Sequence, residues 1–324
     1  MNVLQPGELK KQAAGLLDGT QGAYRKTVLL HSAVSLAALV VIMVLEVLIG
    51  NAMDQTGGLA DMGIRSILGT VRGVLSMAVN ILLPFWELGI LYTSVRVTRR
   101  QNWDFSMLTR GFNRIGPVVR YFLAQIGILI LVAVVCSNIV VMLTMWMPVP
   151  AELQDAMAQI DLTAVPDPEQ LAEILPMEQL TAYMLPTLIL FTVAYCGLLI
   201  HLGYRFRLGQ YLLLDEQKVG AVAALGISNA LTRGNKWKLF RLDLSFWWFY
   251  ALQAVAMAVA YGPELLVLMG VTLPVSAGVA NILFYVLYAG ISLGIAWCAG
   301  AYVQTTYACA YEQLRTPVCP QIEQ

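Results

Sequence analysis

Charged side chains are scarce in this sequence. Asp, Glu, Lys and Arg make up only 12% of the 324 residues, whereas a soluble domain has about 25%. Hydrophobic residues make up 58%, which is more than the few polar residues could cover in a water-soluble globule. This composition excludes a disordered chain, and the balance of 20 basic and 20 acidic residues excludes a basic protein that binds nucleic acid. We therefore expect an integral membrane protein.

Motifs for metal binding and catalysis are also missing. The chain has two histidines, His31 and His201, and five cysteines, but neither Cys-x-x-Cys nor His-Glu-x-x-His. No cysteine lies in an expected outer segment, so we expect no structural disulfide. There is no glycine-rich phosphate loop, no nucleophile paired with a base, and no soluble part large enough for an ATPase. We expect no enzymatic activity, no metal and no cofactor.

Long apolar runs are abundant instead. A helix that spans a bilayer needs about 20 mostly apolar residues. Six runs reach this length, at residues 27–50, 73–93, 118–147, 183–204, 242–261 and 279–302. They predict an all-α polytopic membrane helix bundle with six transmembrane helices in a single integral membrane domain. The fourth run stays apolar to Leu214, so we expect its helix to project beyond the membrane.

The positions of the positive charges indicate how these spans are oriented. Lys and Arg accumulate on the cytoplasmic side of membranes. Only Arg65 and Arg72, of the 20 basic residues, fall in the expected outer connections. Residues 148–182 carry seven acidic residues and no Lys or Arg. We therefore predict a multi-pass protein with both termini in the cytoplasm and an acidic outer loop at 148–182.

Each odd-numbered span is preceded by a stretch with apolar residues at helical spacing. These stretches, at about 5–19, 103–116 and 216–234, predict amphipathic helices at the cytoplasmic interface. The second and third share the tetrapeptide Leu-Thr-Arg-Gly, which indicates three repeated units of an interfacial helix and a transmembrane hairpin. The alternative is that any interfacial helix needs apolar, basic and glycine residues in this order.

The most specific signal lies between residues 204 and 246. An apolar helix ends in an acidic turn at Asp215, and the next helix carries Ser228. Gly-x-Lys-Trp follows at 234–237, and Phe-x-Leu-x-Leu-Ser-Phe at 240–246. These features resemble the bacterial "domain of unknown function 975" family of integral membrane proteins. The resemblance implies a membrane location and no assigned activity.

Two further features bear on that resemblance. The sequence Tyr-Ala-Cys-Ala-Tyr-Glu-Gln-Leu at 307–314 is similar to the closing motif of the family. The chain departs from the family at 216–217, where Glu-Gln replaces the usual Asn-Pro. The geometry of this turn is therefore not implied by the resemblance.

Basic and aromatic residues gather where the chain re-enters the membrane. The candidates for contact with lipid or with a partner are Lys236, Trp237, Lys238, Arg241, Arg110 and Arg114. Lys and Arg heads reach anionic lipid phosphates while their stems lie along apolar surface, and Trp favours the interface. Anchoring of the helices explains these residues as well. The functional alternative is a site for a lipid head group or a partner protein.

One acidic residue, Glu87, lies within a predicted span close to Pro84. Many transporters build a site near the middle of the membrane from an ionisable residue and a broken helix. Glu87 is also only about one to two helical turns from the basic rim that ends at Arg96, so an ion pair there is an equal alternative. Asn80 and Asn281 are polar positions in spans, and we group them with Glu87 as transport candidates.

Two functions are consistent with these features. The first is a non-enzymatic membrane component that interacts with membrane lipids, with a membrane-protein partner or with a second copy of itself. The second is a small transporter or channel that uses Glu87. A water-filled cavity that reaches Glu87 would favour transport, and a packed bundle with an apolar lateral groove would favour the first function.

Overall fold

Among the residues that the structure describes, the apolar runs form helices and no strand. The computed structural model describes residues 4–54, 62–158, 177–216, 218–271, 275 and 277–315. Five helical segments are long and apolar enough to cross a membrane, namely Ala23–Gly50, Ser66–Thr98, Phe112–Met145, Glu178–Asp215 and Gly278–Arg315. A sixth span exists if one bent pair of helices is counted as a single crossing. The expected all-α polytopic bundle is confirmed, and the chain is a multi-pass membrane protein.

The chain divides into two compact units. The first consists of Met1–Arg120 and Arg205–Gln324, and the second of Tyr121–Tyr204. Helices α4 (Ile115–Met145) and α7 (Met177–Phe206) each run from one unit into the other.

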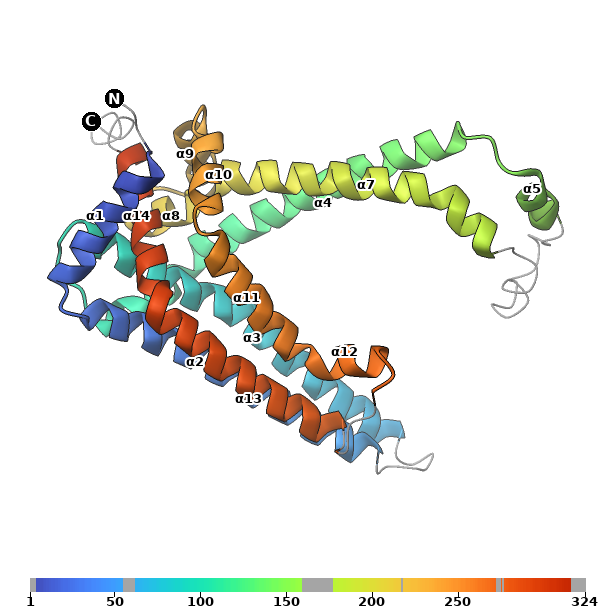
Figure 1. Cartoon of the computed structure of the whole chain (residues 1–324), viewed down its shortest axis with the longest axis horizontal. Helices are drawn as coiled ribbons and strands as arrows, with labels where there is room; N and C mark the ends of the chain where they lie inside the picture. Colours follow the sequence, from blue (N-terminus) through green and yellow to red (C-terminus); the bar gives the residue numbers. More distant parts are fainter. Residues whose placement is uncertain are drawn as a thin grey trace. The chain divides into compact units, whose positions relative to one another are not determined.

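The first unit contains most of the helices. Its long members are α2 (Ala23–Asp54), α3 (Met62–Thr98) and α13 (Ala277–Ile295), and α2 packs against both of the others (Figure 1). A turn of π-helix, Ala296–Gly300, links α13 to α14 (Ala301–Arg315), which packs against α3.

The N-terminal segment forms helix α1 (Pro6–Gly19) and lies against α14. Pro6 suits the first turn of a helix, because a proline needs no backbone N–H there. Leu9, Ala13 and Leu17 are buried, as their spacing of four residues places them on one face. Leu17 also belongs to the main core of this unit, together with Tyr24 of α2.

The stretch predicted as a helix at 103–116 is not an α-helix. It forms two short 3₁₀ helices, η2 (Phe105–Thr109) and η3 (Phe112–Arg114), and α4 follows at once. The backbone of this stretch lies directly on α3, since a Cβ atom added at Gly89 would be 1.9 Å from the carbonyl oxygen of Leu108. We attribute the difference to this close backbone contact, which overrides the local helical pattern.

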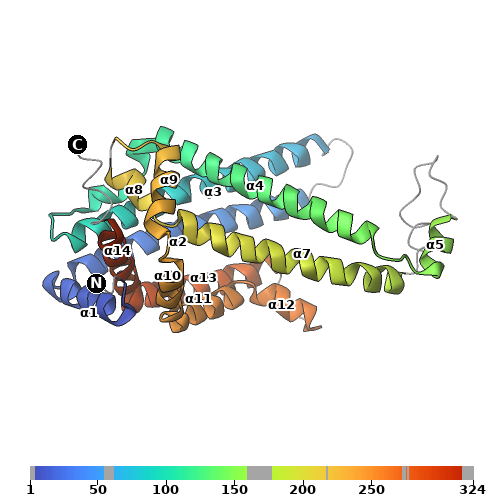
Figure 2. The same cartoon turned by 90° about the horizontal axis from the view of Figure 1, so that it is seen from above.

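The third predicted cytoplasmic helix corresponds to α9 (Ala221–Thr232). The predicted fifth span then differs from a single straight helix, because α10 (Lys236–Leu244) and α11 (Trp247–Ala260) meet at 62° (Figure 2). The break leaves the carbonyl of Ser245 free of the helix, and the ammonium of Lys10 donates a hydrogen bond to it at 2.7 Å. A short helix, α12 (Gly262–Leu268), follows α11.

The apolar extension of the fourth span lies against other helices of the first unit. It forms a separate short helix, α8 (Gly209–Asp215), which packs against α3 and α9. Leu212, Leu213 and Leu214 are at most 1% exposed. These side chains are buried in the first unit, and the expected position of the extension beyond the membrane stays a prediction.

The second unit is simpler. It consists of α4 from Tyr121 onward, the short helix α5 (Ala151–Ala158) and α7 up to Tyr204. The hydroxyl of Tyr183 on α7 donates to the carbonyl of Thr144 on α4 at 3.1 Å. Many apolar side chains of both helices are exposed. Residues 159–176 of the predicted acidic loop lie outside the described residues.

Candidate functional site

Glu87 lies on α3 three residues after Pro84, and the helix continues through the proline. Its carboxylate oxygen Oε2 is 3.9 Å from Nε2 of His31 on α2. The hydroxyl of Ser35 donates to the other carboxylate oxygen at 3.4 Å. The side chain of Glu87 is 54% exposed and that of His31 is 5% exposed. The described titratable neighbour of Glu87 is thus His31, rather than the basic rim at Arg96.

His31 is held in place by Trp86. The two rings stack with centroids 5.2 Å apart, and Nε2 of His31 lies 3.1 Å from the carbonyl oxygen of Trp86. The indole N–H of Trp86 donates to the carbonyl of His31 at 3.1 Å. Because a carbonyl only accepts, this geometry places a proton on Nε2 of His31. Trp86 and Ser35 also line a small apolar pocket of about 190 Å³.

The other two transport candidates do not join this site. The amide of Asn80 donates to the carbonyl of Ser76 in its own helix at 2.8 Å. Asn281 is half-buried on α13. Within the described part of the chain, no hydrogen bond connects Asn80, Asn281 and Glu87 with one another.

Arg110 and Arg114 both contact the protein itself. Arg114 donates from Nη1 to the carbonyl oxygens of Leu213 and Glu216, the latter at 3.1 Å. These bonds satisfy carbonyls at the end of α8, as basic side chains often do at a helix C-terminus. The guanidinium of Arg110 lies 5.4 Å from the centre of the Tyr92 ring.

The ends of α3, α8 and α14 meet in an ion cluster. Arg99 donates to both carboxylate oxygens of Asp215 at 2.6 Å, and its Nη2 donates to Glu312 at 2.6 Å. Arg315 lies 3.6 Å from Asp215 and also pairs with Glu216. Burial alone would lower the pKa of Arg99, but the bonds to the two carboxylates outweigh it and raise this pKa above its ordinary value.

A second polar cluster ties α10 to α14. Arg207 donates to one carboxylate oxygen of Asp243 at 2.5 Å, and the hydroxyl of Tyr307 donates to the other at 2.6 Å. The hydroxyls of Tyr307 and Tyr250 are 2.6 Å apart. The guanidinium of Arg207 also lies over the Tyr307 ring at 4.4 Å. These contacts connect segments that are far apart in the sequence.

The end of α7, α9 and the start of α10 form a pocket of about 580 Å³, here named the basic pocket. It is lined by Arg205, Asn229, Arg233, Gly234, Lys236 and Trp237. The lining holds three cationic side chains and no acidic one. The Trp237 side chain is 68% exposed. Such a lining suits an anionic ligand.

Two observations explain how this pocket forms. The hydroxyl of Ser228 on α9 donates to the carbonyl of Arg205 at 2.9 Å, which brings α9 against the end of α7. Gly234 then turns the chain from α9 into α10 with a φ of +77°, a conformation that favours glycine.

Nε of Arg205 is buried and has no hydrogen-bond partner among the described residues. This unsatisfied donor is one that a bound acceptor could satisfy.

The structure brings only some of the predicted interface residues together. Lys236 and Trp237 line the basic pocket, whereas Lys238 and Arg241 lie on α10 outside its lining. Arg205 and Arg233 were not predicted as binding candidates. In the sequence, both are simply two of the basic residues in one connection between spans. They line the same pocket because α9 packs against the end of α7.

No group of three or more His, Cys, Asp or Glu side chains that could hold a metal ion occurs among the residues whose positions are described.

A comparison with protein families finds one match. The model of a family described as "Protein of unknown function (DUF975)" matches residues 4–317. Searches of the curated proteins and of the solved structures find no match to this chain.

Proposed function

Since the chain belongs to this family of unknown function, we propose from its own geometry that it is a non-enzymatic component of the bacterial cytoplasmic membrane that binds anionic lipid. The binding site in this proposal is the basic pocket. Both termini lie in the cytoplasm, as the location of Lys and Arg in the connections favours. The pocket then faces the leaflet surface that carries anionic lipid head groups on the cytoplasmic side.

The single observation that carries the proposal is the composition of the pocket lining. Arg205, Arg233 and Lys236 surround one cavity with no acidic side chain among its lining residues. A guanidinium presents paired N–H donors that match a phosphate, and an ammonium adds a point charge. Trp237 is exposed beside these cations, and an indole favours the boundary between head groups and acyl chains. Together they match a phosphate with an apolar chain attached.

The test compares two double variants with the same change of charge on neighbouring residues. Arg233→Gln with Lys236→Gln removes two pocket cations, and Lys238→Gln with Arg241→Gln removes two cations of α10 outside the pocket. Each protein is purified and its binding of phosphatidylglycerol is measured by native mass spectrometry, with phosphatidylcholine as the neutral lipid. We expect the pocket variant to lose at least tenfold in affinity and the control to stay within about twofold, because only one cavity gathers the cations.

Equal losses in both double variants would contradict the proposal, since they would indicate attraction to the whole basic face. Unchanged binding in the pocket variant would also contradict it. A thermal unfolding measurement on each variant checks that the loss is not caused by misfolding.

The exposed apolar faces of α4 and α7 are the second part of this proposal. Side chains such as Leu131 and Val193 are 62% and 66% exposed. In a bilayer such faces contact lipid tails, a membrane-protein partner or a second copy of the chain. Cross-linking from a photoreactive residue at position 131 in membranes distinguishes these outcomes, because only a protein neighbour gives a cross-linked band.

A second candidate function, transport, is favoured by one specific observation. Glu87 lies in a spanning helix with His31 at 3.9 Å and Ser35 at 3.4 Å. Two titratable groups at this spacing can exchange or share a proton, and intramembrane acids often mark ion pathways. Glu87→Gln is expected to abolish proton-coupled flux in proteoliposomes while the protein stays folded. Glu264→Gln, on the exposed side of α12, is the control.

The transport measurement uses a pH-sensitive dye trapped in proteoliposomes, with and without an imposed proton gradient. A wild-type protein that moves no protons, or a Glu87→Gln variant that moves them equally well, would exclude this role for Glu87.

A further inference from the structure

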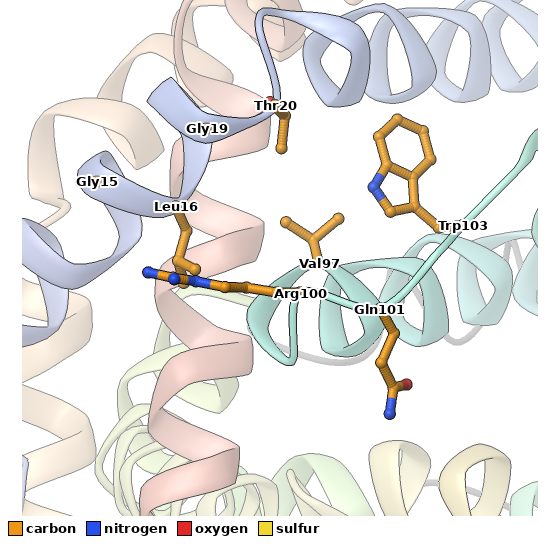
Figure 3. A pocket seen from close by; sticks show the side chains of 8 residues that line it. All are labelled: Gly15, Leu16, Gly19, Thr20, Val97, Arg100, Gln101 and Trp103. Atoms are coloured by element: carbon orange, nitrogen blue, oxygen red, sulfur yellow. The ribbon is translucent and has the colours of Figure 1, made fainter.

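A different pocket lies between α1 and the end of α3, here named the α1–α3 pocket (Figure 3). Its volume is about 570 Å³, within the roughly 300–1,000 Å³ range of small-molecule sites. Gly15 and Leu16 contribute from α1, Val97 and Arg100 from the end of α3, and Trp103 from the segment that follows. It shares no lining residue with the basic pocket.

Arg100 has an unfavourable backbone conformation at the edge of this pocket. Its φ is +54°, in the left-handed region that side chains other than glycine seldom adopt. The backbone N–H of Arg100 donates to the carbonyl of Val97, and that of Gln101 to the carbonyl of Arg96, each at 3.0 Å. This is the Schellman ending of a helix, in which glycine usually holds the place of Arg100. Packing of the helix end therefore does not explain an arginine here.

The side chain of Arg100 is also available to a ligand. It is exposed, and it forms no hydrogen bond or ion pair with the residues that the structure describes. The adjacent Arg99 is the opposite case, because it is held by the carboxylates of Asp215 and Glu312. Arg100 is the single charged residue in the lining of the α1–α3 pocket.

The opposite wall shows a second local conflict. Gly15 lies inside α1, where glycine is a poor helix former because of its backbone entropy. A Cβ atom added at Gly15 would meet nothing within 4 Å, so no close contact requires a glycine. Because glycine has no side chain, the space over the pocket at this position stays open. Two residues that are locally unfavourable thus line one cavity, and such conflicts are expected at functional sites.

The remaining lining sets the chemistry. Leu16 and Val97 present apolar side chains, and Figure 3 shows the indole nitrogen of Trp103 directed into the pocket from the side opposite the guanidinium of Arg100. An indole N–H and a guanidinium only donate hydrogen bonds. The guanidinium fork matches the two oxygens of a carboxylate or phosphate. The walls between these donors match an apolar body.

We infer that the α1–α3 pocket binds an organic anion, a carboxylate or phosphate oxyanion on an apolar body, with Arg100 as the residue that binds the oxyanion. The oxyanion accepts hydrogen bonds from Arg100, and the apolar body lies against Leu16, Val97 and the Trp103 ring. This chemistry is shared by small soluble anions and by anionic lipids. The inference does not depend on the basic pocket, since the two sites have separate linings.

The test uses the full chain in phosphatidylcholine nanodiscs, titrated with phenyl phosphate and with benzoate by isothermal titration calorimetry. Benzyl alcohol is the neutral probe. Two variants remove the site in different ways: Arg100→Gly removes the guanidinium and places glycine where the backbone favours it, and Gly15→Phe fills the cavity. Each is expected to weaken binding of the anion at least tenfold. Gly7→Phe, which adds the same side chain at an exposed position of α1 outside the pocket lining, is expected to bind within twofold of the wild type.

A second experiment, with nanodiscs of two lipid compositions, identifies whether the ligand is a lipid or a soluble anion. The thermal shift between phosphatidylglycerol and phosphatidylcholine nanodiscs is compared for the wild type and Arg100→Gly, whose basic pockets are identical. Binding of a soluble probe that is lost in both variants supports a soluble anion. A lipid-dependent shift that Arg100→Gly reduces supports an anionic lipid. Both results support the site.

Other outcomes would overturn the inference. These are a wild type that responds to neither soluble anions nor anionic lipid, a Gly15→Phe variant that binds as well as Gly7→Phe, or benzyl alcohol binding as tightly as benzoate. The melting temperature of Arg100→Gly should not fall below that of the wild type, because glycine relieves the left-handed strain. If Arg100→Gly loses binding while its melting temperature is unchanged, the loss is caused by removal of the guanidinium and not by unfolding.

Discussion

In the first unit several charged residues pair between packed helices, whereas the two long helices of the second unit expose apolar side chains along much of their length. The span Ser66–Thr98 lies in the first unit. In its apolar stretch of 18 residues, 22% is buried, and the mean hydropathy is 1.8. In Phe112–Met145, which lies mostly in the second unit, 6% is buried and the mean hydropathy is 2.9. Of these two segments, the one with less protein around it is the more apolar one.

This difference has a physical reason. A helix that faces lipid must carry apolar side chains, since lipid offers no hydrogen-bond partner. A helix packed in protein tolerates polar residues where partners are supplied, as His31 and Trp86 supply each other. The helices of the second unit are therefore suited to a lipid or protein environment around them, and the first unit combines exposed apolar side chains, such as Val74, with polar pairs held by contacts within itself. Four paired substitutions test this comparison.

The largest effect is expected from the ion cluster of the first unit. The Asp215 side chain is 6% exposed and accepts two hydrogen bonds from Arg99. Asp215→Asn removes the charge that compensates two arginines, and we expect it to lower the free energy of unfolding by about 3–5 kcal/mol. Asp155→Asn, at an exposed position of α5, is the matched control and should change it by less than about 0.5 kcal/mol. Unfolding in detergent micelles measures both, and equal effects would remove the distinction between the units.

Leucine truncation should show the next largest difference. Leu212 of α8 is fully buried, and Leu131 of α4 is 62% exposed. Leu212→Ala should cost about 2–5 kcal/mol, because it leaves a cavity in packed protein. Leu131→Ala should cost less than about 0.5 kcal/mol, because lipid closes over the smaller side chain. Both are measured in nanodiscs. A large cost at Leu131 would show that protein, from a partner or a second copy, covers this face of α4.

Glycine substitution tests the close packing of helices. A Cβ atom at Gly89 of α3 would overlap the carbonyl of Leu108, whereas one at Gly127 of α4 would meet nothing within 4 Å. Gly89→Ala should therefore cost about 1–3 kcal/mol through overpacking. Gly127→Ala should be neutral or add up to about 1 kcal/mol of stability, because alanine is the better helix former. Thermal unfolding of the two variants decides this, and a stable Gly89→Ala would mean that η2 does not lie on α3.

The smallest effect is expected at the break in the fifth span. Lys10 donates to the carbonyl of Ser245 at 2.7 Å, and its ammonium lies 4.1 Å from the centre of the Phe246 ring. Lys10→Met should cost about 1 kcal/mol, since it removes a charged hydrogen bond and a cation–π contact at a partly exposed site. Lys11→Met, on the exposed side of α1, is the control. Hydrogen exchange at residues 245–250 should rise only in Lys10→Met.

Parts of the site were accessible to sequence reasoning and parts were not. Lys236 and Trp237 were predicted as interface residues, and both line the basic pocket. Arg205 and Arg233 were not singled out, because charge alone does not indicate which cations meet. Glu87 was predicted next to a basic rim or a transport path, and its described partner is His31 of another helix. A pair 56 positions apart leaves no periodic signal in the sequence.

Acidic residues show the same limit. Asp215 was noted only as part of a family motif, and its partners Arg99 and Arg315 come from the end of α3 and from α14. Arg100 gave no signal at all, because its significance depends on a backbone angle and on the wall that α1 forms opposite it.

The sequence alone determined that this is an all-α membrane protein with long apolar spans and that it resembles its family, because hydropathy and motifs are properties of contiguous residues. Only the tertiary structure decided the break between α10 and α11, the burial of α8, the ion cluster of three helix ends and the two pockets. Each of these depends on contacts between distant segments. Whether a helix end is exposed, capped or paired depends on which neighbour reaches it, and chain order does not specify that neighbour.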